Sequence, residues 1–313
     1  MPRKNILVTG GAGYLGSVAA ECLLRAGYAV TVVDKLVHNQ PSLFHLCADP
    51  DFKFIHGDVR DEAVISSALR NADAIIPFAG VVGASACDRD PWMARSVNLE
   101  AIKLINRLRS RDQLVIFPTT NSGYGTKTGD SYCTEDSPLQ PISLYGQTKV
   151  EAENALLDSP NVISLRLATV FGTSPRMRLD LLVNHFVYAA VTDGYIVIFE
   201  KDFKRNYIHI RDVADCMIFC LGNADRMAGR PYNLGLDAAN LSKEELALKV
   251  KEYVPKFYIH YAEVGSDPDQ RNYVVSNQRL RDAGFEAKRS LDDGIKELLK
   301  GYSLLGLSRF MNA

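Results

Sequence analysis

The sequence predicts an α/β fold, in which a doubly wound parallel sheet is joined to a smaller, mixed C-terminal domain. In the first half of the chain, short β-branched and apolar runs alternate with longer amphipathic stretches, which is typical of parallel strands connected by helices. A glycine-rich turn follows the first of these runs. The strict alternation lapses after Gly172, where strand-like and helical stretches mix. We therefore expect a sheet domain with a second domain interleaved with it.

The predicted strands of the sheet are nearly apolar throughout, as expected of strands covered on both faces. They lie at residues 5–9, 29–34, 53–56, 74–78, 113–118 and 161–166. The clearest helices of this half lie at 14–26, 91–109 and 145–157, the second with proline in its first turn.

The second half is predicted to hold helices at 180–191 and 212–221 and strands at 195–199, 206–210 and 232–234. A capping-box pattern, Ser242 with Glu245, begins a further helix, and a terminal helix is expected around 291–302.

The domain division follows from this pattern. We assign residues 1–172 to the sheet domain, with 206–230 returning to it, and residues 173–205 and 231–313 to the smaller domain. No repeat, low-complexity tract or linker separates them, so we expect one rigid unit with a cleft. Ligands bind beside the carboxyl ends of the strands in such sheets.

Composition excludes several classes of partner. Of the 313 residues, 47% are hydrophobic and 23% charged, and a net charge of -1 gives no field that would attract nucleic acid or a membrane. The six cysteines show no metal-ligand spacing, so we expect no metal and interpret them as buried thiols of a reducing compartment. The N-terminal segment contains far too few apolar residues for a signal peptide or a membrane span. We therefore expect a cytoplasmic protein.

The turn after the first strand carries glycine at three-residue intervals, at Gly10, Gly13 and Gly16. Without side chains there, the backbone can approach a pyrophosphate. The helix that begins at Tyr14 and Leu15 supplies unpaired N–H groups and a partial positive charge. The turn therefore predicts a dinucleotide cofactor in a Rossmann-type fold.

Asp34 closes the second strand and bears on the choice of cofactor. A carboxylate there can accept hydrogen bonds from both hydroxyls of the adenosine ribose but would repel a 2′-phosphate, which favours NAD over NADP. The alternative is a turn residue at the end of a strand.

Two more strand ends are candidates for cofactor contact. Asp58, followed by Val59, ends the third strand, where its carboxylate could accept a hydrogen bond from the adenine amino group. Alternatively, Asp58 is the N-cap of the next helix. Phe78, Ala79 and Gly80 end the fourth strand and would leave room for the cofactor, although a tight loop explains them equally well.

Tyr145 and Lys149 carry the predicted chemistry. Four residues apart, they lie on one face of a helix, so the ammonium can approach the phenol. A cation about 4 Å away stabilises a tyrosinate, which could remove a hydroxyl proton while hydride leaves for the cofactor. An isolated pair of this kind is usually a surface feature. Here it follows Asp34 and the Thr119–Thr120 pair that ends the fifth strand, which favours an active site.

With these motifs the chain resembles the extended short-chain dehydrogenase/reductase family, specifically its NAD-dependent nucleotide-sugar epimerase/dehydratase branch. The resemblance lies in TGGAGYLG, GDVRD, Ser96-Val97-Asn98, TTNSGYG, YGQTK, LRLATVFG, RNYIHIRDVAD and YNLG. It implies that Thr120 hydrogen-bonds the reacting hydroxyl and that Tyr145 is the acid/base. It also implies that Lys149 holds the nicotinamide ribose and lowers the pKa of the tyrosine, and that Asn98 lies at the cofactor.

The resemblance also implies basic contacts to the substrate. Arg205 and Arg271 would engage the pyrophosphate or ribose of a sugar nucleotide, whose oxygens suit the arginine fork. Either could instead be an ordinary surface ion-pair partner. Arg176 and Asp180, in the basic segment 174–180, are further candidates, with a solvated loop as the alternative. His209 is expected to be a buried structural residue.

Three departures from the family pattern narrow the reaction. The sugar 4,6-dehydratases of the family carry an aspartate and a glutamate where this chain has Asn121 and Ser122. An amide and an alcohol cannot replace that acid/base pair, which argues against a dehydratase. Thr169 stands where UDP-galactose 4-epimerases usually have an asparagine that binds the substrate phosphate, which puts the usual UDP-hexose in doubt.

The favoured function is thus an NAD-dependent nucleotide-sugar 4-epimerase of carbohydrate biosynthesis. A 4-dehydrogenase that releases the 4-keto sugar, GDP-linked or a heptose, needs the same residues and stays open. A non-catalytic NAD-binding module is disfavoured because Thr120, Tyr145 and Lys149 are all retained. A reductase of non-nucleotide carbonyls would prefer NADPH, against which Asp34 argues. The resemblance implies a homodimer through the helices at 91–109 and 145–157.

Overall fold

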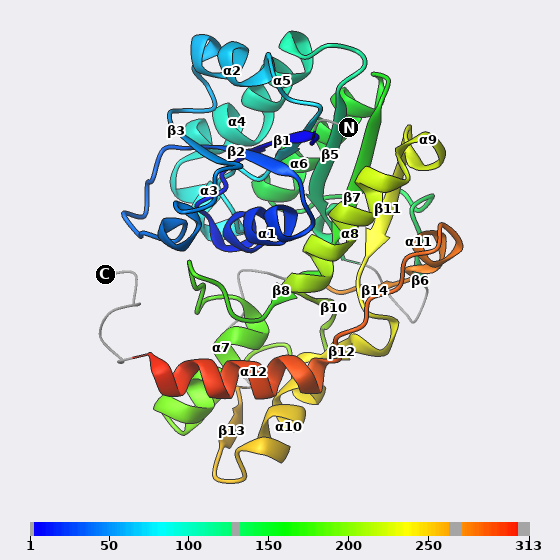
Figure 1. Cartoon of the computed structure of the whole chain (residues 1–313). Helices are drawn as coiled ribbons and strands as arrows, with labels where there is room; N and C mark the ends of the chain where they lie inside the picture. Colours follow the sequence, from blue (N-terminus) through cyan, green and yellow to red (C-terminus); the bar gives the residue numbers. More distant parts are fainter. Residues whose placement is uncertain (1–2, 127–131, 263–270, 306–313) are drawn as a thin grey trace.

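The computed structural model describes residues 3–126, 132–262 and 271–305. Its larger lobe is a parallel sheet of seven strands in the order β11-β7-β5-β4-β1-β2-β3 (Figure 1). The strands are β1 (Asn5–Thr9), β2 (Ala29–Asp34), β3 (Phe52–His56), β4 (Ala74–Pro77), β5 (Leu114–Thr120), β7 (Val162–Leu167) and β11 (Arg230–Leu234). The predicted α/β class and Rossmann-type sheet are therefore confirmed.

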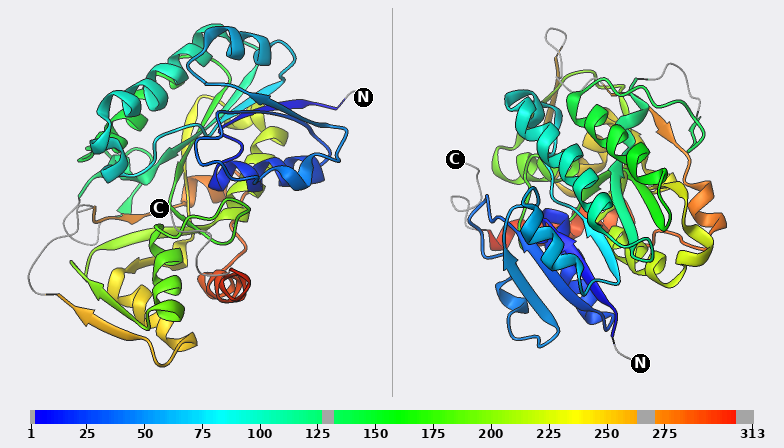
Figure 2. Two further views of the ribbon diagram at one scale, coloured as in Figure 1. Left: turned by 90° about the vertical axis from the view of Figure 1, so that its left-hand side faces the viewer. Right: turned by 90° about the horizontal axis from the view of Figure 1, so that it is seen from above.

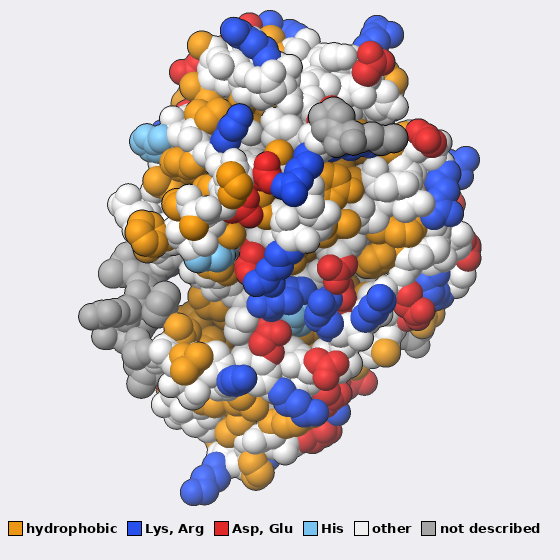
Figure 3. Space-filling model, in the orientation of Figure 1, with side chains coloured by type: hydrophobic (Ala, Val, Ile, Leu, Met, Phe, Trp, Pro, Cys, Tyr) orange, Lys and Arg blue, Asp and Glu red, His pale blue; other side chains and the backbone are white. Residues whose placement is uncertain are grey.

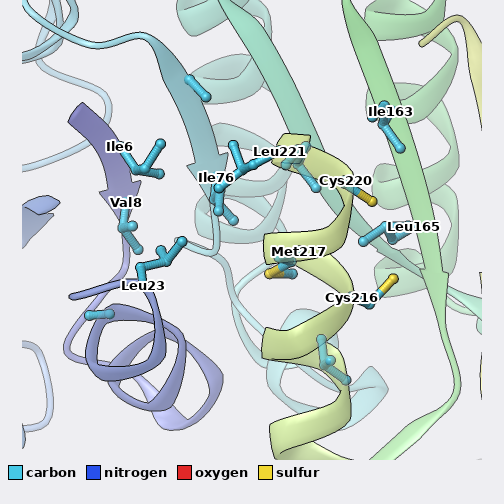
Figure 4. Close-up of a cluster of buried hydrophobic side chains, with 14 of the residues drawn as sticks. Ile6, Val8, Leu23, Ile76, Ile163, Leu165, Cys216, Met217, Cys220 and Leu221 are labelled. Atoms are coloured by element: carbon cyan, nitrogen blue, oxygen red, sulfur yellow. The ribbon is translucent and has the colours of Figure 1, made fainter. Parts of the chain in front are cut away.

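Helices cover both faces of this sheet (Figure 2). One face packs on α1 (Tyr14–Arg25), α8 (Ile210–Gly222) and α9 (Ala224–Met227). Figure 4 shows this core, with α8 inserting Met217 and Cys220 toward the strands. The other face packs on α2 (Glu62–Leu69), α5 (Ala101–Leu108) and α6 (Leu144–Leu157).

The helix predicted over 91–109 is interrupted in the middle. It comprises α4 (Pro91–Arg95), a wider π-helical turn η2 (Ser96–Glu100) and α5. Such turns are frequently found at functional sites. Here the turn carries Asn98, whose side chain is buried.

The third strand differs from the prediction of strands covered on both faces. Among the described strands β3 pairs only with β2 and lies at the edge of the sheet, and its Phe54 is 40% exposed. An apolar run does not distinguish an edge strand from a central one, because strand order is decided by tertiary pairing.

The smaller lobe contains short sheets. In one, β10 (Lys204–His209) pairs with β8 (Thr169–Phe171) and β12 (Asn240–Ser242). Two-stranded sheets join β9 (Tyr195–Ile198) to β13 (Tyr258–Tyr261) and β6 (Tyr132–Cys133) to β14 (Val274–Val275).

The remaining elements of this lobe are helical: α7 (Leu182–Thr192), η4 (Asp237–Ala239), α10 (Lys243–Tyr253), α11 (Gln278–Asp282) and α12 (Leu291–Leu304). The capping box of Ser242 and Glu245 is present at the start of α10, as predicted. Three short elements lie in the larger lobe: η1 (Phe44–Leu46), α3 (Ala84–Arg89) and η3 (Asn121–Tyr124).

The strands that cross between the lobes correct the expected boundaries. Residues 206–209, expected to return to the large sheet, belong to β10 in the small one. Residues 231–234, expected in the smaller domain, belong to β11, which pairs with β7 at the end of the large sheet. Short strands of similar composition do not reveal their partners, which long-range pairing decides.

The two lobes share a core and a set of ion pairs. One buried cluster combines α1 residues with Phe171 and with residues of α7, α10 and α12. Arg289, which precedes α12, forms ion pairs with Asp212 and Asp215 of α8. Basic and acidic side chains mix across the middle of the face drawn in Figure 3. The lobes therefore share buried contacts, and their rigidity as one unit stays a prediction.

The burial of the cysteines differs from the prediction. All six cysteines are free, but Cys47 is exposed and Cys22 half-buried, so the expectation of six buried thiols is wrong. Cys47 follows η1 in a surface loop, where spacing says nothing about burial.

Within the described ranges, no helix has the length and apolar character needed to cross a bilayer.

Candidate functional site

The turn between β1 and α1 has the shape that a pyrophosphate requires. Gly10 has φ +70°, and a Cβ on it would lie 2.4 Å from the backbone N of Ala79. A Cβ on Gly16 would lie 2.3 Å from the carbonyl oxygen of Gly10, so the turn must stay bare. Gly13 caps α1 without a side-chain hydrogen bond, leaving the first-turn N–H groups to a ligand. These residues fit the phosphates of NAD.

Tyr14 and Leu15 begin α1 directly after this turn. The hydroxyl of Tyr14 donates to the carbonyl of Gly172 (2.7 Å) and accepts from Nδ2 of Asn184 (3.2 Å). Leu15 is half-buried against the core of both lobes. The side chains of both residues therefore contact the smaller lobe next to the glycine turn. Any contact that they make with the cofactor would come from their backbone N–H groups.

Asp34 lies at the end of β2, next to the glycine turn. Its Oδ2 accepts from the N–H of Ala12 (2.9 Å) and its Oδ1 from the N–H of Leu36 (2.7 Å). The residue thus does act as a turn residue, which was the alternative interpretation. Because it is half-buried beside the turn, its contact with the ribose stays a prediction compatible with this geometry.

Asp58 is held by two cations. Its Oδ2 lies 2.6 Å from Nη2 of Arg60 and 3.0 Å from Nζ of Lys35. Hydrogen bonds from Arg60 hold the pKa of this carboxyl well below its usual range. The N-cap of α2 is Asp61, so the alternative role of Asp58 as that cap is wrong. Val59 is buried in the core. An adenine contact by either residue stays a prediction.

The loop after β4 is shaped by Asn98. Its Oδ1 accepts from the N–H of Val81 (2.8 Å), and its Nδ2 donates to the carbonyl of Val81 (2.9 Å) and to Oγ1 of Thr148 (3.4 Å). A Cβ on Gly80 would lie 3.0 Å from that Oδ1. Phe78 is half-buried against the core. Asn98 therefore joins the predicted cofactor loop to α6.

The three predicted catalytic residues come from β5 and α6. Thr120 is the last residue of β5, and Tyr145 and Lys149 lie one turn apart near the start of α6. Ser143 fixes that start, because its hydroxyl accepts from the N–H of Gly146 (3.2 Å). Thr120 lies close enough to the phenol of Tyr145 to lower its pKa.

The charge state of Tyr145 is set by opposing effects. Burial raises the pKa of its phenol. The positive charges of Arg271 and Arg178 lower it, and so does the neighbouring hydroxyl of Thr120. Two cations of the described residues, Arg178 and Arg271, thus act on Tyr145. The expected contribution of Lys149 stays a prediction, because it requires a charged ammonium.

Lys149 is 8% exposed, and its Nζ lies 4.2 Å from the ring centroid of Phe117. Burial lowers its pKa to about 7, and the negative charge of Glu153, one helical turn further on, opposes that change. Glu153 is itself buried and paired with Arg166, Nη2 to Oε1 2.6 Å. Sequence reasoning missed Glu153, although its spacing from Lys149 was a signal.

Beside Thr120, the short turn η3 places two buried polar residues. The hydroxyl oxygens of Thr120 and Ser122 are 2.8 Å apart, and Nη1 of Arg271 donates to the hydroxyl of Ser122. Asn121 is 1% exposed, and its amide makes no hydrogen bond with the described residues. Thr169 begins β8 and is half-buried. Asn121 is therefore the candidate here with unmet hydrogen-bonding capacity.

The predicted substrate arginines are largely buried. Arg205 is 3% exposed and lies 5.6 Å from the ring centroid of Tyr273, so it is not a surface ion-pair residue. Arg176 is 4% exposed and its Nε makes no hydrogen bond with the described residues, so a solvated loop is wrong for this residue. Asp180 is exposed and accepts from Nε of Arg178 (2.9 Å).

His209 has a structural role, as expected. It is fully buried, its Nδ1 caps α8 by accepting from the N–H of Arg211 (3.2 Å), and its Nε2 lies 3.0 Å from Oε2 of Glu297.

Comparisons with known proteins agree with this geometry. The model of the NAD dependent epimerase/dehydratase family matches residues 6–235. The low-salt glycan biosynthesis protein Agl12 of Haloferax volcanii is 27% identical, covering 95% of this chain and 98% of that protein. UDP-arabinose 4-epimerase 1 of Arabidopsis thaliana is 28% identical, covering 89% and 77%.

Among solved structures, dTDP-glucose 4,6-dehydratase of Bacillus anthracis, in complex with NAD, superposes with a TM-score of 0.84 at 20% identity, covering 97% of this chain and 98% of that one. This likeness shows the fold, and the family match shows the cofactor. The chain belongs to the NAD dependent epimerase/dehydratase family and is an NAD-dependent enzyme.

Proposed function

We propose that the chain is a nucleotide-sugar 4-epimerase that acts through a 4-keto sugar. The observation that carries this proposal is the meeting of the Thr120 hydroxyl and the Tyr145 phenol at the end of β5, one helical turn from the buried Lys149. The relatives named as 4-epimerases support a nucleotide diphosphate sugar as substrate.

In this proposal Tyr145 Oη takes the proton of the sugar C4 hydroxyl, while Thr120 Oγ1 hydrogen-bonds the same oxygen. Bound NAD supplies the acceptor and later the donor of the C4 hydride. As the C4–H electron pair leaves with the hydride, the C4–O bond becomes a carbonyl. When hydride returns to the other face, Tyr145 gives the proton back and the configuration at C4 is inverted.

The residues after Thr120 favour this reaction over a dehydration. Elimination of water needs an acid and a base beside the sugar, and the buried Asn121 and Ser122 offer an amide and a hydroxyl. Neither titrates near neutral pH. Asn121, with its unpartnered amide, is instead suited to hydrogen-bonding sugar hydroxyls.

We place the sugar nucleotide between the two lobes. The larger lobe would hold NAD at the carboxyl ends of its strands, and the smaller lobe the substrate. The buried Arg176 and Arg205, together with Arg271, would pair with the pyrophosphate, with Asp180 and Thr169 beside them. The Nε of Arg176 is buried and makes no hydrogen bond within the described ranges, and such an anion would stabilise its guanidinium.

A second candidate, a 4-dehydrogenase that releases the 4-keto sugar, is favoured by the charges near Tyr145. The positive charges of Arg271 and Arg178 act on this phenol. Two arginines there would hold a sugar nucleotide in one orientation and oppose the rotation that an epimerase needs. A GDP-linked sugar or a heptose is the substrate class for this alternative.

A panel of UDP-, GDP-, dTDP- and CDP-sugars tests both candidates. Product mass and NMR are recorded together with the absorbance of reduced nicotinamide. An isomer of unchanged mass without lasting absorbance supports the epimerase. A product lighter by two hydrogens supports the dehydrogenase and excludes the epimerase. A non-catalytic module would give neither product with any member of the panel.

The proposed enzyme is a homodimer through α4, α5 and α6. Trp92, in the first turn of α4, is 69% exposed, with Arg60 5.5 Å from its ring centroid. An exposed tryptophan on a helical face suits an interface. Light scattering tests this, and a monomeric mass would contradict it.

A further inference from the structure

We propose that Ser174 couples the binding of the sugar nucleotide to the binding of NAD. Its hydroxyl joins α1, the helix that begins at the glycine turn, to Arg176, which the proposed function assigns to the substrate pyrophosphate. Ser174 is then a positioning residue that acts through Arg176. The inference rests on that proposed role of Arg176.

Ser174 is bound to the start of α1. Its hydroxyl donates to the backbone carbonyl of Tyr14 (2.7 Å), and its oxygen lies 3.1 Å from Oγ of Ser17. Because a carbonyl can only accept, the hydrogen of Ser174 is committed to Tyr14, and Ser17 donates in the second contact. Ser17 is fully buried. A residue that follows β8 is thus held by two residues of the helix at the cofactor turn.

The same hydroxyl fixes the backbone of Arg176. The N–H of Arg176 donates to Oγ of Ser174 (3.2 Å), in a turn where a serine side chain bonds the backbone two residues further on. With one bond donated and two accepted, the hydroxyl has no capacity left for a ligand. Ser174 therefore acts through the residues that it holds, rather than as a contact to the substrate.

We call residues 172–178 the strap, and its two ends are held by Asn184 of α7. Oδ1 of Asn184 accepts from the N–H of Gly172 (3.0 Å), and Nδ2 donates to the carbonyl of Arg178 (2.9 Å). Asn184 is fully buried. Both ends of the strap are therefore fixed to the smaller lobe, while Ser174 fixes its middle to the larger lobe.

The guanidinium of Arg176 has unmet hydrogen-bonding capacity. Its side chain is 4% exposed, and its Nε makes no hydrogen bond with any described residue. Burial lowers the pKa of His38, in the loop that follows Asp34, and the positive charges of Arg176 and Arg178 lower it further. The arginines of the strap therefore act on the larger lobe as well, close to the strand end where the cofactor is expected.

This arrangement predicts coupling because the NAD phosphates fit the first turn of α1. With that turn held by a cofactor, the carbonyl of Tyr14 and the hydroxyl of Ser17 are fixed, and Ser174 keeps Arg176 in place. A nucleotide then binds without the entropic cost of ordering the strap. Coupling between two binding sites is reciprocal, so the nucleotide should also tighten the binding of NAD.

The test measures the release of NAD from the full-length holoenzyme by its exchange for fluorescent etheno-NAD. UDP, GDP, dTDP and CDP are added in turn, and the nucleotide that slows release most is kept. In the wild type it should slow release about tenfold. In Ser174→Ala the slowing should fall below about threefold, because Arg176 is no longer fixed to α1. Ser174→Thr keeps the hydroxyl and should restore the slowing.

Two further variants make the result specific. Ser137→Ala is the matched control, since Ser137 is also half-buried but bonds the N–H of Thr134 outside the strap, and its slowing should equal that of the wild type. Arg176→Met should reduce the slowing as Ser174→Ala does. The double variant should lose no more than either single one, because the two residues form one link. Arg176→Met also provides a second measurement if Ser174→Ala does not fold.

Slowing of wild-type size in folded Ser174→Ala or in folded Arg176→Met would overturn the proposal, and so would additive losses in the double variant. A wild type in which none of the four nucleotides slows NAD release would overturn it too. The readout needs no turnover. A coupled enzyme that converts no sugar nucleotide would therefore reject the proposed reaction and support the role of Ser174. An active enzyme with unchanged variants would reject only the coupling.

Discussion

The ammonium of Lys149 on α6 lies 4.2 Å from the ring centroid of Phe117 on β5. The ring face attracts a cation, whereas burial keeps the ammonium away from water. Burial has the larger effect, since the pKa of Lys149 is lowered to about 7. The lysine of the proposed catalytic helix therefore changes charge near neutral pH.

This shift predicts a pH-dependent contribution to stability. An unfolded lysine has a pKa of about 10.4, so between pH 7 and 10 the unfolded chain binds more protons at this site than the folded one. The free energy of unfolding should then rise with pH, by at most about 1.4 kcal/mol per pH unit from this group. Lys149→Met removes this titrating group. The variant should therefore be more stable than the wild type at pH 7, and this difference should shrink toward pH 10. Urea unfolding at several pH values measures this, and parallel curves for the two proteins would contradict it.

Removing the proposed acid/base should separate catalysis from binding. Tyr145→Phe lacks the hydroxyl that takes the C4 proton, so turnover on the best sugar nucleotide should fall by about 10²- to 10⁴-fold. The dissociation constant of NAD should change little, because the ring remains. Tyr195→Phe serves as the control, since Tyr195 is 57% exposed on β9. Equal activity of the two variants would exclude Tyr145 as the acid/base.

Asp34 should decide between NAD and NADP. Asp34→Asn removes the charge that repels a 2′-phosphate, and an amide oxygen cannot accept from Ala12 and Leu36 as the two carboxylate oxygens do. We expect NAD to bind about tenfold more weakly and the preference over NADP to narrow, as measured by fluorescence titration. Asp49→Asn, which alters a carboxylate bonded to the N–H of Asp51, should leave both affinities unchanged. A preserved preference in Asp34→Asn would remove this residue from cofactor selection.

Breaking the buried Glu153–Arg166 ion pair beside Lys149 should lower the free energy of unfolding more than replacing both residues with apolar ones. Glu153→Leu leaves the Arg166 guanidinium buried without its carboxylate, which should lower the free energy of unfolding by about 3–5 kcal/mol. The double variant with Arg166→Met should recover part of that loss, because two apolar side chains leave no unpaired charge.

An exposed pair provides the control for this experiment. Glu62→Ala breaks the pair of Glu62 with Arg107 and should cost less than about 1 kcal/mol in the same urea measurement. A double variant as unstable as Glu153→Leu would mean that packing, rather than the unpaired charge, accounts for the loss.

The local elements of the site could be predicted from the sequence. The glycine turn, the strand that ends at Asp34 and the helix carrying Tyr145 and Lys149 all depend on backbone preferences and side-chain spacing over a few residues. For the same reason the start of α10 at its capping box was predicted from Ser242 and Glu245.

Tertiary structure alone decided which distant residues meet. Ser122 and Arg271 are 149 positions apart, and no periodicity connects them. The partner strands of β10 and β11 and the exposure of β3 likewise depend on long-range pairing. The pKa of Lys149 depends on burial against Phe117, which the sequence spacing of the helix cannot show. The sequence by itself determined the fold class, the family and the residues that carry the proposed chemistry. Packing between segments far apart in the chain determined their charge states and their hydrogen-bond partners.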